Sequence, residues 1–250
     1  MKKTLIALMA LASVACAGEI VTMEQLVDGA TFGAGVVKDT YYTSTVYNFN
    51  TEGAITNITN STVLEMLSGT TGYVTIAAWV NQTDGGEDAM FSVGGQNDGF
   101  KFSLKNDNLQ ITTKGVADKN TSMAVTQGTI DAPAWTLVAV TIDLDKTGAD
   151  SYFFTGADGY TTLTQSAGWA LGSWRALTTE TMAIGSGNGN GLRDGFAGQI
   201  ANLTIFTSET AATSESIMAV MGNTAPIPEP ATATLSLLAL AGLCARRRRA

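Results

Sequence analysis

The decisive stretch of this 250-residue sequence is Trp135-Thr136-Leu137-Val138-Ala139-Val140-Thr141-Ile142-Asp143. Residues 73–80, which read Tyr-Val-Thr-Ile-Ala-Ala-Trp-Val, have the same character. Both stretches are apolar almost throughout, and such runs are typical of strands that are covered on both faces. We therefore expect both to be central strands of a sandwich, with Trp79 and Trp135 in its core.

The rest of residues 20–225 reads as shorter strands separated by turn-forming clusters. Phe100-Lys101-Phe102-Ser103-Leu104-Lys105 alternates apolar and polar residues, which predicts a strand with one wet face. Gly, Asn and Asp gather at 84–86, 107–108 and 185–195, and they are expected to mark hairpin reversals. The chain is thus predicted to be all-β, an antiparallel β-sandwich or jelly roll. Further strands are expected at 41–49, 89–93, 109–113, 151–155, 160–164, 181–184 and 199–206, and short helices at 61–67 and 214–221.

The order of these segments resembles the laminin-G-like or concanavalin A-like jelly roll, over about residues 70–221. The family usually continues with a Tyr-x-x-Gly strand after the hairpin at Asp143, and residues 152–156, Tyr-Phe-Phe-Thr-Gly, match it only approximately. Residues 18–70 match poorly and are expected to supply edge strands or a lead-in. The residues that carry the resemblance are 74–80, 135–143, Ile184-Gly185, the run from Phe196 to Phe206 with its Phe-x-Gly-x-Ile pattern, and Ser214 to Ile217.

The N-terminus has the layout of a secretory signal peptide. Two lysines precede the apolar residues 5–14, and the small residues Ala15-Cys16-Ala17 follow. Cleavage is expected after Ala17, so that residues 1–17 form a removable signal helix. A lipoprotein signal, with Cys16 as the acylated residue, is the alternative.

The C-terminal residues 226–250 have three parts in a fixed order. Pro228-Glu229-Pro230 stops any helix of the preceding domain, because proline and the residue before it disfavour the helical region. The charge-free run 231–245 would reach about 22 Å as a helix, short of a bilayer core of about 30 Å. Arg246-Arg247-Arg248-Arg249 is costly to translocate, so the arginines are expected to stay cytoplasmic and the preceding chain to lie outside the inner membrane.

This tail resembles the PEP-CTERM sorting signal, the tag on which exosortase-type transpeptidases act in Gram-negative bacteria. The resemblance implies an exosortase-type transpeptidase as a partner and processing near Pro228-Glu229-Pro230. It also implies transient insertion of residues 231–245 into the inner membrane and a final site that is extracellular or at the cell surface. A plain C-terminal transmembrane anchor is the alternative, and it leaves the Pro-Glu-Pro triplet unexplained.

Composition limits the partners of the processed chain. Residues 18–230 hold all 22 acidic residues but only 8 of the 14 basic ones, which gives a net charge of −14. Such a surface repels phosphates, so neither nucleic acid nor anionic lipid is an expected partner. Both cysteines, Cys16 and Cys244, lie in the removable ends, so residues 18–225 are expected to form one disulfide-free domain with a core of its own.

Catalytic patterns are absent from the sequence. It contains no histidine, and this removes the usual general base, the usual zinc ligand and the Ser-His-Asp triad. By the laminin-G-like resemblance, an enzyme on this fold would be expected to look like a laminarinase-type glucanase, which carries its nucleophile and acid on one strand as Glu-x-Asp-x-x-Glu, and the sequence lacks this pattern. We predict no catalytic residues and a protein that is not an enzyme; a relative of glycoside hydrolases is the disfavoured alternative.

Laminin-G-like domains often bind Ca²⁺ at the rim of the sandwich, so the resemblance makes Ca²⁺ a candidate ligand. Two loops offer the oxygen ligands that Ca²⁺ takes. Asp, Asn and Gly are also turn formers, and neither loop has a regular ligand spacing. Turn formation accounts for both loops, so no cofactor and no metal site is predicted. The two groups are Asp84, Glu87 and Asp88, and Asn188, Asn190 and Asp194.

Trp169 and Trp174 lie in residues 168–175, Gly-Trp-Ala-Leu-Gly-Ser-Trp-Arg, which read as a connection and not as a clean strand. An exposed indole can stack on the apolar face of a sugar ring, and Arg175 can donate to its hydroxyls. The alternative is a poorly patterned strand whose tryptophans cap the core, since large aromatics are mostly buried. The candidate glycan-binding residues are Trp169, Trp174 and Arg175.

These observations predict a secreted or cell-surface, non-catalytic β-sandwich that is sorted by exosortase-type processing and binds a polysaccharide or surface glycan. A purely structural component of the extracellular matrix, without a small ligand, is the alternative.

Overall fold

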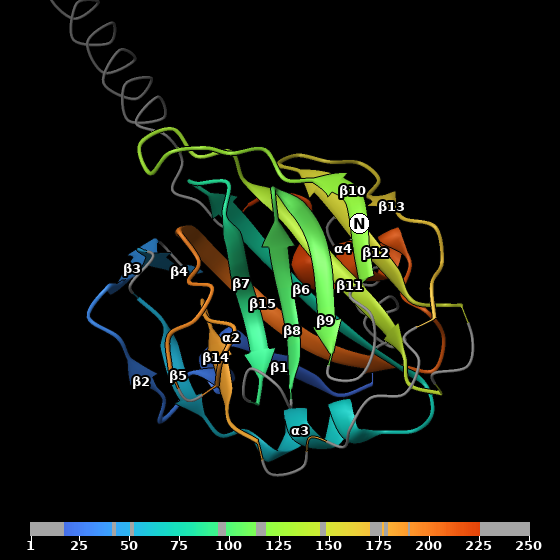
Figure 1. The fold of residues 1–250 in the computed structure, drawn as a ribbon. Coiled ribbons are helices and arrows are strands. Elements are labelled where there is room, and N and C mark those ends of the chain that lie inside the picture. The colour runs from blue at the N-terminus through green and yellow to red at the C-terminus, as the bar shows by residue number, and fades with distance from the viewer. Residues whose placement is uncertain are drawn as a thin grey trace, which may run out of the picture.

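The computed structural model describes residues 18–41, 44–50, 53–94, 99–113, 119–145, 149–170, 177, 180–189 and 191–225. Two antiparallel sheets lie face to face in this part of the chain, so the predicted all-β sandwich with short helices is confirmed (Figure 1). The expected signal peptide, residues 1–17, and the sorting tail, residues 226–250, lie outside the described residues. Within the described ranges, no helix has both the length and the apolar character needed to cross a bilayer.

The larger sheet, sheet A, has the strand order β13-β12-β11-β6-β15-β4-β3, and β1 pairs with β15 beside this path. The smaller sheet, sheet B, has the order β10-β9-β8-β7-β14-β5-β2. Sheet A consists of β1 (Ile20–Thr22), β3 (Val36–Tyr41), β4 (Ser44–Phe49), β6 (Tyr73–Gln82), β11 (Thr136–Asp143), β12 (Tyr152–Ala157), β13 (Thr164–Gln165) and β15 (Gly198–Ser208). Sheet B consists of β2 (Thr31–Phe32), β5 (Ile55–Ile58), β7 (Glu87–Val93), β8 (Phe100–Lys105), β9 (Asn108–Thr113), β10 (Lys119–Ala124) and β14 (Met182–Ile184).

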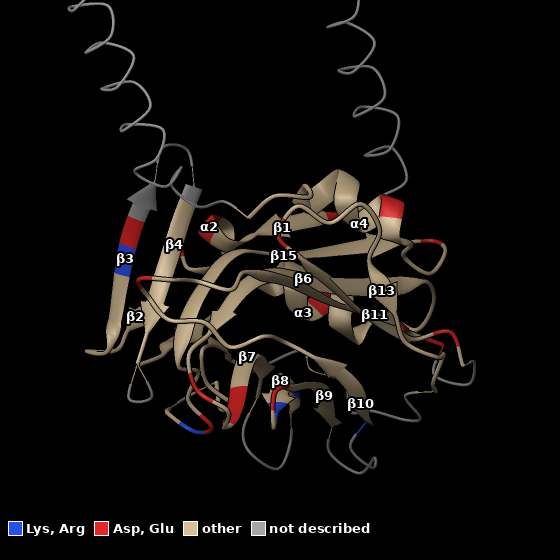
Figure 2. Cartoon of the chain, turned by 90° about the horizontal axis from the view of Figure 1, so that it is seen from above, with Lys and Arg blue, Asp and Glu red and all other residues tan. Residues whose placement is uncertain are grey.

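Sheet A is covered on both faces, and this explains its uninterrupted apolar strands. On β6, Val74 and Ile76 belong to the main core between the sheets, whereas Ala77 and Trp79 belong to a second cluster that includes residues of helix α4 (Ser214–Met221). Figure 2 shows α4 on the side of sheet A that faces away from sheet B. Trp79 and Trp135 are buried as predicted, but in the layer under α4 and not between the sheets.

The helices form where capping residues and apolar spacing predict them. Asn60 precedes α3 (Ser61–Ser68), and its side chain accepts a hydrogen bond from the backbone N–H of Val63 at 3.1 Å. Thr213 caps α4 by accepting from the N–H of Ser216 at 3.3 Å. α3 adds four buried apolar side chains to the main core, and a short helix, α2 (Met23–Leu26), adds two more.

Two predicted strands are wrong in extent. Residues 41–49 belong to two paired strands and not to one: Tyr41 ends β3 and lies opposite Ser44, the first residue of β4. β3 was missed because an edge strand needs no continuous apolar pattern. Of residues 160–164, only Thr164 joins a strand, β13. Tyr160 instead sets its ring 6.0 Å from that of Trp79, and its hydroxyl donates to the carbonyl oxygen of Gly222 at 2.8 Å.

Two predicted hairpin turns are connections between the sheets. Residues 84–86 join β6 of sheet A to β7 of sheet B, and residues 185–195 lead from β14 back to β15. Residues 107–108 do form the expected hairpin, between β8 and β9. Turn-forming composition thus marks a reversal of the chain, but it does not say whether the next strand joins the same sheet.

Candidate functional site

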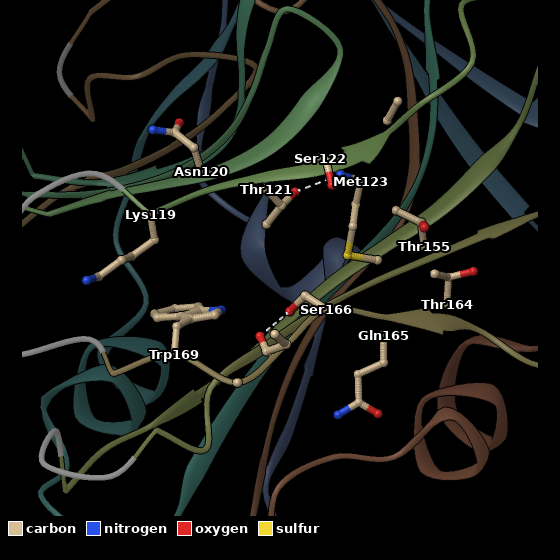
Figure 3. Close-up of a pocket in the computed structure, with 13 residues that line it drawn as sticks. Lys119, Asn120, Thr121, Ser122, Met123, Thr155, Thr164, Gln165, Ser166 and Trp169 are labelled. Carbon is tan, nitrogen blue, oxygen red and sulfur yellow. Dashed lines mark hydrogen bonds between the residues drawn. The ribbon is translucent and has the colours of Figure 1, made fainter.

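A cleft of about 860 Å³ opens where the edge strands of the two sheets meet (Figure 3). One wall is β10, the last strand of sheet B, and the other is formed by β12, β13 and the segment that follows them. The lining residues are Lys119, Asn120, Thr121, Ser122, Met123, Ala124, Thr155, Thr164, Gln165, Ser166, Ala167, Gly168 and Trp169.

The side chains of β10 alternate between the cleft and the outer face of sheet B. Asn120 turns outward, and its side-chain oxygen accepts a hydrogen bond from Gln110 at 2.6 Å. Lys119 and Met123 turn the other way, and Figure 3 shows both directed toward the opposite wall. Met123 also packs against the main core, so β10 carries apolar contact at one end of the cleft and positive charge at the other.

Trp169 forms the opposite wall and is held from two sides. Its backbone exchanges hydrogen bonds with Ser151, N–H to oxygen, at 3.0 and 3.2 Å. Its indole stacks on Phe153 with ring centroids 5.1 Å apart and an interplanar angle of 30°. The stack occupies one face of the indole, and the half-buried side chain lines the cleft. Trp169 therefore packs against the main core and also lines the cleft.

Of the three candidate glycan-binding residues, the structure places Trp169 in the cleft. Trp174 and Arg175 lie outside the described residues. So do the sorting residues Pro228, Glu229, Pro230, Arg246, Arg247, Arg248 and Arg249.

Sequence reasoning missed the polar residues of both walls. Residues 119–124 read Lys-Asn-Thr-Ser-Met-Ala, a run without the apolar alternation that marks a strand. Gln165 and Ser166 lie only a few residues before Trp169 in the sequence, and that nearness was the one available signal. Because the two walls are about 40 residues apart in the chain, only the sandwich topology brings them together.

The described cleft lining is polar but contains no carboxylate. Seven of its thirteen residues carry a hydroxyl or an amide, two of them (Asn120 and Ser122) at outward-facing positions of β10, and Lys119 is the only charged residue among the thirteen. Ser166 donates to the carbonyl oxygen of Ala167 at 2.9 Å and accepts from the N–H of Phe153 at 3.0 Å. Such a surface can hydrogen-bond a hydroxylated ligand and stack against its apolar face.

The two loops considered for calcium meet in space around a lysine. Lys101 of β8 pairs with Glu87 from the first loop and, at 2.9 Å, with Asp194 from the second. Burial lowers the pKa of Lys101, but the hydrogen bonds and charges of Glu87 and Asp194 outweigh it and hold the pKa above its usual value. Asn190 lies outside the described residues. Among the residues that the structure describes, no three His, Cys, Asp or Glu side chains are placed to hold a metal ion.

Asp88, beside this cluster, is a buried carboxyl group. Its two oxygens accept hydrogen bonds from the side chain of Gln82 and from the N–H of Ala197, the latter at 3.2 Å. Burial, reinforced by the negative charge of Asp84, raises the pKa of Asp88 to about 7, although both hydrogen bonds oppose the rise. The side-chain oxygen of Gln82 is buried without a hydrogen-bond partner.

The raised pKa of Asp88 predicts a protein that loses stability as the pH rises from about 4 to about 7. The folded state binds the Asp88 proton more tightly than the unfolded chain, so the free energy of unfolding falls through this window and is level above it. Asp88→Asn stays neutral at every pH, and its new amide can donate to the oxygen of Gln82. Urea unfolding at pH 5 and pH 8 measures the free energy of unfolding of both proteins. Relative to the wild type, that of the variant should be higher at pH 8 than at pH 5 by about 1–3 kcal/mol.

The control for this prediction is Asp131→Asn, which changes an exposed aspartate. It is expected to follow the wild type at both values of pH. An equal pH dependence in wild type and Asp88→Asn would contradict the assignment of the titration to Asp88.

The fold has known relatives. The family model described as "Concanavalin A-like lectin/glucanases superfamily" matches residues 52–217. Domain 4 of AbnA, a GH43 extracellular arabinanase from Geobacillus stearothermophilus solved in complex with arabinotriose, is 14% identical with a TM-score of 0.50, and the match covers 82% of this chain and 89% of that one. The CBM40 of the Ruminococcus gnavus IT-sialidase, bound to α2,3-sialyllactose, is 13% identical with a TM-score of 0.45, covering 75% and 96%.

The receptor-binding domain of botulinum neurotoxin mosaic serotype C/D is 15% identical with a TM-score of 0.46, and the match covers 80% of this chain. This chain corresponds to only 44% of that neurotoxin domain. No curated protein matches the sequence. At these identities the solved structures bear on the fold alone. Because the family model covers more than half of the sequence, the chain belongs to the concanavalin A-like lectin/glucanase superfamily, as the laminin-G-like resemblance predicted.

Proposed function

We propose that this protein is a non-catalytic glycan-binding module, and that the cleft between β10 and β12–β13 is its binding site. One observation carries the proposal: a half-buried tryptophan, Trp169, is fixed by Phe153 in the wall of a cleft that is otherwise rich in hydroxyl and amide groups. Sugars present both an apolar face, which stacks on an indole, and hydroxyls, which both donate and accept hydrogen bonds. The cleft offers a partner for each.

The absence of catalysis is part of the proposal. Glycoside hydrolysis commonly needs two carboxyl groups on either side of the scissile bond. The described lining of the cleft includes no Asp and no Glu. The buried Asp88 and the Lys101 cluster belong to the loops that connect the sheets and not to this lining.

We also propose that the protein is exported and sorted by its two terminal segments, residues 1–17 and 226–250, and this part rests on their sequences. The described domain closes just before the tail: Ala225 is buried, and its N–H donates to Asp158 at 2.7 Å. The Pro-Glu-Pro triplet, the apolar run and the four arginines of residues 226–250 support a removable PEP-CTERM signal for an exosortase-type transpeptidase. Deleting residues 226–250 should move the protein from the cell surface or medium to the periplasm of the producing bacterium. An unchanged distribution in cell fractions would contradict the sorting role.

Binding is tested by applying the full-length protein, kept in a detergent without a sugar headgroup, to an array of polysaccharides with and without Ca²⁺. We expect saturable binding to at least one polysaccharide. A folded protein that binds nothing in either condition would overturn the proposal and favour a purely structural role in the extracellular matrix.

A further inference from the structure

The charge of the cleft lining is opposite in sign to the net charge of the protein. Acidic residues outnumber basic ones by 22 to 14 in the whole sequence. Figure 2 shows Asp and Glu scattered over the strand ends and loops of both layers. The only charge in the described lining of the cleft is nevertheless positive, that of Lys119. The binding of a neutral polysaccharide would not require a positive charge in the cleft.

Lys119 has no acceptor near its ammonium group in the described part of the chain, as is also true of the exposed Lys105, whereas the remaining described cations have partners. Lys101 is neutralised by Glu87 and Asp194, and Arg193 lies 3.4 Å from Asp194. Lys38 lies over the ring of Tyr47, with its nitrogen 5.8 Å from the ring centroid. In the part of the chain that the structure describes, Lys119 makes no ion pair, and Figure 3 shows its side chain extending past the indole of Trp169.

The opposite wall adds a second unmatched donor. The indole N–H of Trp169 is buried and has no hydrogen-bond partner in the folded protein. An unpaired buried donor costs about 1–3 kcal/mol, which a ligand oxygen can recover if the indole turns slightly to reach it. One wall thus has a free cation and the other a free N–H, while the described lining holds no carboxylate to satisfy either.

We propose that the cleft selects acidic polysaccharides, with the carboxylate of a uronic-acid-type sugar at Lys119 and the ring of a neighbouring sugar on Trp169. This rests on the proposed glycan binding and adds its ligand class. A charge-assisted hydrogen bond between an ammonium and a carboxylate is roughly twice as strong as a neutral one. The net negative charge of the protein opposes the approach of any polyanion, so the contacts at Lys119 and Trp169 have to outweigh this repulsion.

The test compares each acidic polymer with its own uncharged form. Polygalacturonate, alginate and hyaluronan are offered to the full-length protein beside the same polymers after reduction of their carboxyl groups, with a panel of neutral polysaccharides in parallel. We expect at least one acidic polymer to bind at least tenfold more tightly than its reduced form. Lys119→Gln should lower affinity for that polymer about tenfold, the effect of losing one charge-assisted contact, and leave any affinity for neutral forms unchanged.

Lys105→Gln is the matched control, because it removes the same charge from an exposed position on β8 outside the cleft. Its affinity should equal that of the wild type. Equal binding of the acidic and reduced forms, binding to neutral polysaccharides only, or an equal effect of Lys105→Gln would overturn the acidic selectivity while glycan binding stands. No binding to any polymer would overturn glycan binding itself, and the selectivity with it.

Discussion

Trp169→Ala should lower glycan affinity about 30-fold, which corresponds to about 2 kcal/mol, and leave a folded protein. The indole supplies the aromatic face of the cleft, and alanine removes both that face and the N–H. The stack on Phe153 is lost too, so a decrease in thermal stability is expected alongside. Titration calorimetry with the best array ligand measures the first effect, and circular dichroism measures the second.

Phe32→Ala is the control for Trp169→Ala. Phe32 is 43% exposed and lies on β2, the edge strand of sheet B at the end opposite β10. Its removal takes an aromatic side chain from the surface without touching the cleft. Unchanged affinity in a folded Trp169→Ala, or a loss as large in Phe32→Ala, would contradict the placement of the site.

Trp79→Ala should cost about 3–5 kcal/mol of folding free energy, because it leaves a cavity between sheet A and α4. Trp79 is fully buried, and its N–H donates to the carbonyl oxygen of Met221 at 3.4 Å. Its ring also lies beside that of Tyr160, which is tied to Gly222. The substitution therefore loosens the whole C-terminal segment of the domain, and urea unfolding measures the cost.

The two tryptophan variants serve as controls for each other. Trp169→Ala should destabilise less than Trp79→Ala, since Trp169 is only half-buried. Molecules of Trp79→Ala that remain folded should bind glycan as the wild type does. If Trp79→Ala were no more destabilising than Trp169→Ala, the second cluster, between sheet A and α4, would not contribute to stability as a core does.

The central strands were predictable because the environment of each strand determines the pattern of its own residues. Burial on both faces makes β6 and β11 continuously apolar, and the polar outer face of sheet B gives β8 its alternation. That face is not wet as expected, since Ser103 is buried and Lys101 is largely covered. Helices α3 and α4 were predictable because a capping residue and regularly spaced apolar residues mark each of them in the sequence. Short edge strands such as β2 and β10 were not, because they pair on one side only and need no apolar pattern.

The cleft could be predicted only in part. Trp169 was identifiable because its segment lacks a strand pattern, but nothing local marks Lys119 as its neighbour across the cleft. That pairing depends on sheet order, which makes β10 and β13 the edges at the same end of the sandwich. Likewise, Lys101 reads as the exposed position of an alternating strand, whereas the fold sets it between two acidic loops.

The central claim, that glycan binds between β10 and β12–β13, is tested most directly by hydrogen exchange of the full-length protein with and without the best ligand from the array. Backbone amides of residues 119–124 and 164–169 should exchange more slowly in the complex, since these segments form the two walls. Protection confined to residues 185–195 and the outer face of sheet B, with the two walls unchanged, would contradict it.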